Sequence, residues 1–146
     1  MKTTDSIQEE IIAEFSMLGG DQEMMLVYLM ELGQKLPPIS EADHSEENIV
    51  KGCQSKVWLT AAAEGDRLIF NADSNTAITK GLVSLLIRIY SGQTPQAILD
   101  TQIDFPGRIG MERFIGTQRS NGFASMILQF RRYAIAYMAA MTQQAS

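Results

Sequence analysis

The sequence predicts an α+β fold in which a small antiparallel sheet of about three strands packs against helices. Apolar residues recur at intervals of three and four over residues 7–18, 25–32, 78–89 and 123–141, which is the spacing of amphipathic helices. Between the second and third stretches, residues 57–73 combine β-branched and aromatic residues with a central turn cluster, the pattern of a β-hairpin. The 146 residues suffice for one core, so residues 1–146 are expected to form a single domain.

Two helices are predicted at the N-terminus. Ser6 and Glu9 form a capping-box pattern ahead of the first apolar stripe, which ends at Gly19-Gly20. Asp21 is placed to cap the second helix, and Pro37-Pro38 ends it because proline cannot continue the helical hydrogen bonds. The short connection predicts an antiparallel pair.

The middle of the chain predicts a surface loop followed by the hairpin. Residues 39–48 are polar and acidic and show no apolar period, which is typical of a loop. Residues 57–63 and 67–73 read as two strands joined by Glu64-Gly65-Asp66. Ile49-Val50 is expected to add part of a third strand.

The C-terminal half predicts helices with one irregular segment. Ser74 or Asn75 is available to cap the helix that starts near residue 76, and Thr94-Pro95 opens a short helix. Residues 103–116 contain Pro106 and three glycines and are expected to be irregular, with Ser120 preceding the last helix. That long helix is expected to pack against the sheet through Phe123, Ile127, Phe130 and Tyr137.

Composition excludes several classes of function. A net charge of -5 and a pI near 4.8 argue against nucleic acid as a partner, because phosphate binding uses clustered Lys and Arg. The sequence shows no apolar stretch of membrane-spanning length and no targeting pattern at its start, so we expect a cytoplasmic protein without a membrane partner. A single cysteine forms no internal disulfide and cannot supply the thiolates of a zinc or iron-sulfur site, so no metal is expected.

Cys53 is therefore expected to act as a single thiol, if it acts at all. It follows Gly52 on a connection between the acidic loop and the first good strand, and Lys51 and Lys56 flank it. Either ammonium group could favour the thiolate, the nucleophilic form in thiol and persulfide exchange. The alternative from spacing alone is that Cys53 is a small buried apolar residue.

Three ordered motifs carry a family resemblance. The string IVKGCQSKVWL at residues 49–59 closely resembles the active-cysteine segment of the SufE family. ADSNTAITKGL at residues 72–82 and RSNG at residues 119–122 resemble the acidic turn with its helix start and the late Arg-Ser-x-Gly segment of that family. Weaker matches, such as residues 31–37 and Thr94-Pro95, extend the likeness to nearly the whole chain.

The resemblance implies a SufE/IscU-like fold and a sulfur carrier and activator rather than an enzyme. Such a protein takes the outer sulfur of a persulfide from a SufS-type cysteine desulfurase onto Cys53, stimulates the desulfurase, and delivers sulfur to an iron-sulfur scaffold. Pyridoxal phosphate belongs to the desulfurase, so no cofactor is expected on this chain. The cysteine loop is implied to be a retractable tip, in which Gly52, Gln54, Ser55 and Lys56 support the loop or contact the partner.

Two further residues carry over from the motifs. Asp73 matches the family's acidic position, and Arg119 matches an arginine near the cysteine loop that bridges to the partner or steadies the loop. Each also has a purely structural interpretation, Asp73 as a helix-start acceptor and Arg119 as an exposed ion-pair partner. One stretch departs from the family, because Phe114–Thr117 stands where relatives have His-Leu-Ser/Thr-Pro. The only histidine, His44, is expected to be solvated in the acidic loop.

Three other functions remain open at this point. A cysteine hydrolase would need a general base beside the thiol, and His44 is the only histidine available. A U-type cluster scaffold would need ligands from a second chain. A regulatory adaptor would bind the desulfurase without carrying sulfur, and detection of a persulfide on Cys53 separates that adaptor from a carrier.

Overall fold

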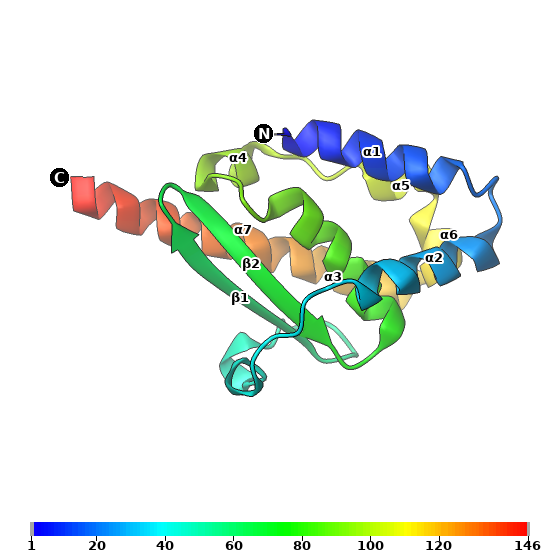
Figure 1. Cartoon of the computed structure of the whole chain (residues 1–146), viewed down its shortest axis with the longest axis horizontal. Helices are drawn as coiled ribbons and strands as arrows, with labels where there is room; N and C mark the ends of the chain where they lie inside the picture. The colour runs from blue at the N-terminus through cyan, green and yellow to red at the C-terminus, as the bar shows by residue number, and fades with distance from the viewer. Residues whose placement is uncertain (1, 146) are drawn as a thin grey trace.

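The hairpin lies on one side of the molecule, with α7 passing behind it and α3 beside β2 (Figure 1). The computed structural model describes residues 2–145, with side chains up to residue 143. Strand β1 (Val57–Glu64) pairs antiparallel with β2 (Arg67–Ser74) in a register that runs from Val57 opposite Ser74 to Glu64 opposite Arg67. Gly65, at the first position of the tight turn, has φ +64°, a conformation that glycine adopts without steric cost. The predicted hairpin and the α+β class are confirmed.

The expected third strand is reduced to one bridge. Within the described residues the sheet has two strands, and Ile49 forms a single antiparallel bridge to Trp58. The N–H of Val50 donates to the carbonyl of Val57 at 2.8 Å, but the chain then turns away at Gly52, where φ is +97°. Because the pairing ends there, the ladder cannot continue along β1.

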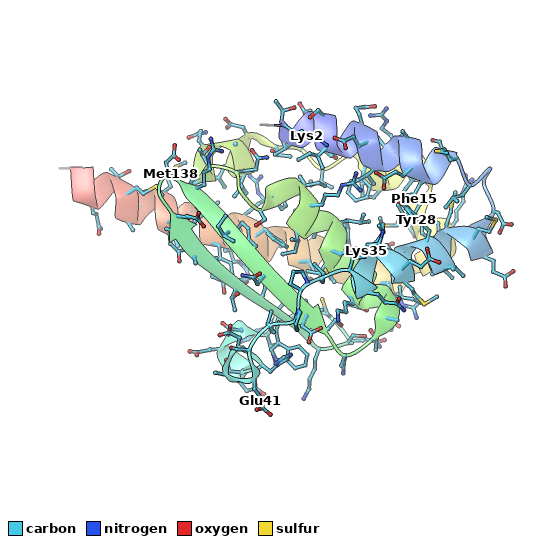
Figure 2. The ribbon with its side chains drawn as sticks, viewed as in Figure 1. Lys2, Phe15, Tyr28, Lys35, Glu41 and Met138 are labelled. Atoms are coloured by element: carbon cyan, nitrogen blue, oxygen red, sulfur yellow. The ribbon has the colours of Figure 1, made fainter. Side chains whose placement is uncertain are left out.

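The two N-terminal helices are α1 (Thr4–Ser16) and α2 (Gln22–Gln34), which run in opposite directions as predicted (Figure 1). Phe15 and Tyr28 hold them together edge to face, with ring centroids 5.2 Å apart (Figure 2). The caps agree with the prediction for α2, where Asp21 accepts from the N–H of Met24.

The predicted capping box at Ser6 and Glu9 is wrong. The side chain of Thr3 caps α1 by accepting from the N–H of Ser6 at 3.0 Å. Glu9 instead pairs with Arg108, with Nη1 donating to Oε1 at 2.5 Å. The helix begins three residues before the sequence pattern suggests, because Thr3 is itself a residue that caps helices.

Helices α2 and α3 (Ala77–Tyr90) approach each other backbone to backbone. A Cβ on Gly81 would lie 2.2 Å from the carbonyl oxygen of Leu29, and one on Gly33 would lie 2.6 Å from the nitrogen of Gly81. The predicted cap of α3 at Ser74 or Asn75 is wrong: Thr76 holds that position without a side-chain cap bond. Both predicted residues bond to Lys56 instead.

Short helices fill the segment expected to be irregular. After α4 (Pro95–Asp100), which Thr94 caps as predicted, the chain forms α5 (Phe105–Ile109) and α6 (Met111–Ile115) on either side of Gly110, at φ +67°. Residues 39–48, expected as a loop, contain two single 3₁₀ turns at Glu41–Asp43 and Glu46–Asn48. Figure 2 shows Glu41 of this segment far from Met138, beyond the open end of the hairpin.

The last helix, α7 (Thr117–Ala145), begins three residues before Ser120, directly after Gly116 with φ +88°. As predicted, Phe123 and Phe130 are buried, while Ile127 and Tyr137 are half-buried. Phe130 packs on Phe70 of β2 with ring centroids 4.7 Å apart, and Tyr137 donates to the carbonyl of Ala61 at 3.1 Å. No helix among residues 2–145 is both long and apolar enough to cross a membrane.

Candidate functional site

Cys53 lies on a loop, residues 51–56, at the open end of the hairpin and beside the start of α3 (Figure 1). Buried Val50 and Val57 fix its two ends. Its C-terminal end is joined to the β2–α3 connection, where the N–H of Lys56 donates to Oδ1 of Asn75 at 3.0 Å and Thr76 donates to the hydroxyl of Ser55 at 2.8 Å. These bonds are exposed, so water can replace them when the loop moves.

The N-terminal part of the loop is seated by glycine. Gly52 is exposed, and its φ of +97° is one that residues with a Cβ rarely adopt. A Cβ there would lie 2.4 Å from Oγ of Ser125 in α7. Gly52 therefore lets the loop lie directly on α7, which is a physical reason for glycine before the cysteine.

The Cys53 side chain is half-buried and points at the first turns of α7. Its thiol donates to the carbonyl oxygen of Gly122 at 3.4 Å, and a Cβ on Gly122 would lie 3.4 Å from Sγ. Burial raises the pKa of the Cys53 thiol above its usual value. Burial is the one cause of this shift, and neither Lys51 nor Lys56 contributes to it. The expected stabilisation of the thiolate by these lysines is therefore not seen in this conformation.

Cys53 lines a cleft of about 410 Å³ between the loop, α3 and the start of α7. Three of the predicted site residues line it, Gln54 and Ser55 from the loop and Arg119 from α7. Residues that were not predicted as site residues complete the wall. They are Thr79, Leu82, Ile115, Gly116, Thr117, Gln118, Gly122 and Met126.

Arg119 reaches this cleft without an ion-pair partner. Its Nη1 donates to the carbonyl oxygen of Ile115 at 3.1 Å, and none of the carboxylates in the described part of the chain forms a salt bridge with it. The interpretation of Arg119 as an ion-pair partner is therefore wrong, and the guanidinium adds a positive charge beside Cys53.

Asp73 lies at the end of β2 and does not line the cleft. Its carboxylate binds Nε2 of His44 at 2.7 Å and Nζ of Lys80 at 3.3 Å. Burial acts to raise the pKa of Asp73, but hydrogen bonds from His44, the N–H of Ser74 and Lys80 outweigh it and lower that pKa. Asp73 thus connects the 40–48 segment to α3, and the residues that follow it, Ser74, Asn75 and Thr76, bond to the Cys53 loop.

His44 is not a freely solvated side chain, contrary to the expectation. Its Nδ1 lies 3.0 Å from the carbonyl oxygen of Ser40, and its ring stands edge-on to Trp58 at a centroid distance of 4.7 Å. It does not line the cleft of Cys53. Lys56 does not line it either, and contributes through its backbone.

The stretch that departs from the family pattern lies at the cleft. Ile115, Gly116 and Thr117 form part of its wall, whereas Phe114 is buried against Phe15 with ring centroids 6.0 Å apart. Apolar, glycine and hydroxyl groups thus stand where an imidazole was expected from the resemblance. Within the described residues, no group of three His, Cys, Asp or Glu side chains could hold a metal ion.

Comparisons with known proteins agree with the motifs. Residues 9–134 match the family described as SufE, Fe-S metabolism associated domain. An uncharacterized SufE-like protein of Rhizobium meliloti (strain 1021) is 36% identical over 131 residues, which cover 86% of this chain and 93% of that relative.

A solved structure has the same fold. The solution structure of a hypothetical protein from Thermus thermophilus superposes with a TM-score of 0.75, covering 91% of this chain and 96% of that one. At 21% identity, this likeness concerns the fold alone.

Proposed function

This chain belongs to the SufE family, whose domain is associated with Fe-S metabolism, and from that premise we propose that it is a sulfur acceptor. Cys53 takes the outer sulfur of a persulfide from a SufS-type, pyridoxal-phosphate-dependent cysteine desulfurase and passes it to an iron-sulfur scaffold in the cytoplasm. The observation that carries the proposal is the placement of Cys53, the only cysteine, on an exposed loop beside a cleft.

The proposed transfer is a thiol exchange without net oxidation. The thiolate of Cys53 attacks the outer sulfur of the desulfurase persulfide, and a new S–S bond forms on Sγ. The S–S bond within the donor breaks, and the donor cysteine leaves as a thiolate. The desulfurase is then free for another turnover, which accounts for its stimulation without any catalytic group on this chain.

The resting geometry supports a movement of the loop during this reaction. The thiol is the donor to Gly122, and burial raises its pKa, so the resting state favours the unreactive protonated form. Moving the loop outward restores contact with water or places Sγ in the active site of the partner. We therefore propose that the loop is a retractable tip, with Gly52 as the residue that permits the resting position.

The rival functions lack support at this site. A hydrolase needs a base beside the thiol, but His44 is held by Asp73 and Ser40 and does not line the cleft. A cluster scaffold needs several ligands, and Cys53 has no other thiol or imidazole among the described lining residues of its cleft. The regulatory adaptor is the remaining alternative, and an experiment has to distinguish it from a sulfur carrier.

Intact-mass analysis after incubation with desulfurase and cysteine tests the proposal. Wild type is expected to gain one sulfur, about 32 Da, which a thiol reductant removes because persulfides exchange with thiols. Cys53→Ser, which keeps the shape but not the ionisable thiol, is expected to bind the desulfurase without gaining mass or stimulating turnover. If Cys53→Ser stimulates as well as wild type, the protein is an adaptor and the carrier mechanism fails.

A further inference from the structure

Thr79 is a buried polar residue at the Cys53 cleft, and its side chain forms no hydrogen bond within the described residues. It is 5% exposed and lines the cleft from the first turn of α3. Its hydroxyl has no hydrogen-bond partner among residues 2–145. The hydroxyls of Ser45 and Tyr90 also lack a partner but are fully enclosed, whereas that of Thr79 is not. Buried hydroxyls are normally bonded, so this one, which still meets open space, is available to a group in the cleft.

The start of α7 faces the same cleft with positive electrostatic potential. Gly116, Thr117, Gln118 and Arg119 all line it. The first backbone bond of the helix runs from the N–H of Ser120 to Gly116, so the preceding N–H groups have no intrahelical partner. The N-terminus of so long a helix favours a negative charge.

Charge within the cleft has one sign. Arg119 carries the only charge among the described residues that line it. Its guanidinium forms no ion pair with a carboxylate in the described part of the chain. An unpaired cation, a helix N-terminus and an unsatisfied hydroxyl thus line the same cleft as Cys53. These are the groups that bind a small anion.

We infer that this cleft is a binding subsite for the anionic terminal sulfur of the Cys53 persulfide, with the Thr79 hydroxyl as its hydrogen-bond donor and Arg119 as its counter-charge. The inference rests on the proposed sulfur carriage. A persulfide extends Cys53 by one sulfur atom, and a cleft of about 410 Å³ has room for it without displacing α3 or α7. Thr79 and Arg119 are positioning residues here, since they hold the sulfur but do not transfer it.

The subsite gives the loaded and unloaded protein different resting states. The neutral thiol bonds to the carbonyl of Gly122, whereas an anionic sulfur is repelled by a carbonyl oxygen and attracted to donors. Loading is therefore expected to turn the end of the side chain from Gly122 toward Thr79. The sulfur is sheltered from solvent reductants while it waits.

The test loads the full chain without a desulfurase. The Cys53 thiolate attacks a terminal sulfur of inorganic tetrasulfide, forming the persulfide and releasing trisulfide. After the excess is removed, the rate of persulfide alkylation is followed against pH. Thr79→Val, which keeps the shape and loses the hydroxyl, is expected to raise the persulfide pKa by about one unit, since a hydrogen bond to a charged group contributes about that much.

Matched variants separate the hydroxyl from packing. Thr79→Ser keeps the donor and is expected to titrate like wild type, as is Thr60→Val on β1, whose hydroxyl bonds to Asn71 away from the cleft. Arg119→Gln is expected to raise the same pKa. Thr79→Ala repeats the test without β-branching if Thr79→Val does not fold.

The inference is overturned if the persulfides of Thr79→Val or Thr79→Ala and of Arg119→Gln titrate and decay as in wild type. Failure of the proposed function looks different. In that case tetrasulfide loads Cys53 and the variants shift its titration, but the desulfurase with cysteine adds no sulfur.

Discussion

Replacing Gly52 by alanine should displace the Cys53 loop and leave the fold in place. The new methyl group would lie 2.4 Å from Oγ and 3.0 Å from Cβ of Ser125, at a backbone φ of +97°. Backbone strain of this kind costs about 1–3 kcal/mol, and the overlap adds to it. Both costs disappear when the loop moves away from α7, so the displaced population is expected to rise about 5- to 150-fold.

The assay is the rate at which a small alkylating reagent modifies Cys53 at fixed pH. Gly52→Ala is expected to react faster by that factor, because the thiol leaves Gly122 and regains water. The melting temperature is expected to change little, because the loss of stability cannot exceed the free energy that holds the loop against α7. Gly65→Ala, with a similar φ of +64° and open space around it, is the control that strains a turn far from Cys53.

A second substitution identifies the contact responsible. Ser125→Ala removes the nearer of the two atoms that the new methyl group meets, so Gly52→Ala/Ser125→Ala is expected to react at a rate between those of wild type and Gly52→Ala. If Gly52→Ala labels at the wild-type rate and melts as wild type does, the loop is not seated as described and the retractable tip loses its physical basis.

Three other predictions concern the frame around the site. Gly81→Ala places a methyl group 2.2 Å from the carbonyl oxygen of Leu29 and is expected to destabilise the protein by about 2 kcal/mol or more, whereas Gly107→Ala, with open space, should be near neutral in chemical denaturation. Asp73→Asn removes a carboxylate whose pKa is lowered in the folded state, and it is expected to lower the free energy of unfolding by about 1 kcal/mol at pH 6. This loss should vanish as the pH falls through the lowered pKa. A difference in unfolding free energy that stays constant down to pH 2 would contradict the prediction. Tyr133→Phe loses the hydroxyl that donates to β1 at 3.1 Å, and a melting curve identical to wild type would contradict the expected loss of about 1 kcal/mol.

Elements encoded by neighbouring residues could be predicted from the sequence. The hairpin follows from strand-forming residues around Gly65, and the caps at Asp21 and Thr94 lie directly before their helices. The two short helices α5 and α6 could not be predicted, because five residues each are too few to show a helical period. The sequence pattern places the start of α7 too late because Ser120 is a good cap residue, while Gly116 sets the actual break.

At the site, motif similarity pointed to Cys53 and to Gln54, Ser55 and Arg119 in the same cleft, but not to the rest of the wall. Thr79 and Gly122 lie far from Cys53 in the chain, and both stand inside quoted motifs without any local signal of their role. The flanking lysines misled because the pKa of the thiol is set by its burial and not by its neighbours in the sequence. His44 misled in the opposite way, since its partners, Asp73 and Trp58, come from another part of the sequence.

The single bridges beside the hairpin also affect how this protein meets others. An open strand edge recruits strands from other chains, and a two-stranded sheet has two such edges. Here the chain covers each with its own backbone: Val50 bonds to β1 at 2.8 Å, and on β2 the N–H of Leu68 donates to Gln93 at 2.9 Å. Strand addition is blocked at these positions, so we expect partners to meet this protein through side chains and the Cys53 loop. Contacts of that kind separate readily, which is consistent with the proposed role as a carrier that moves sulfur between two proteins.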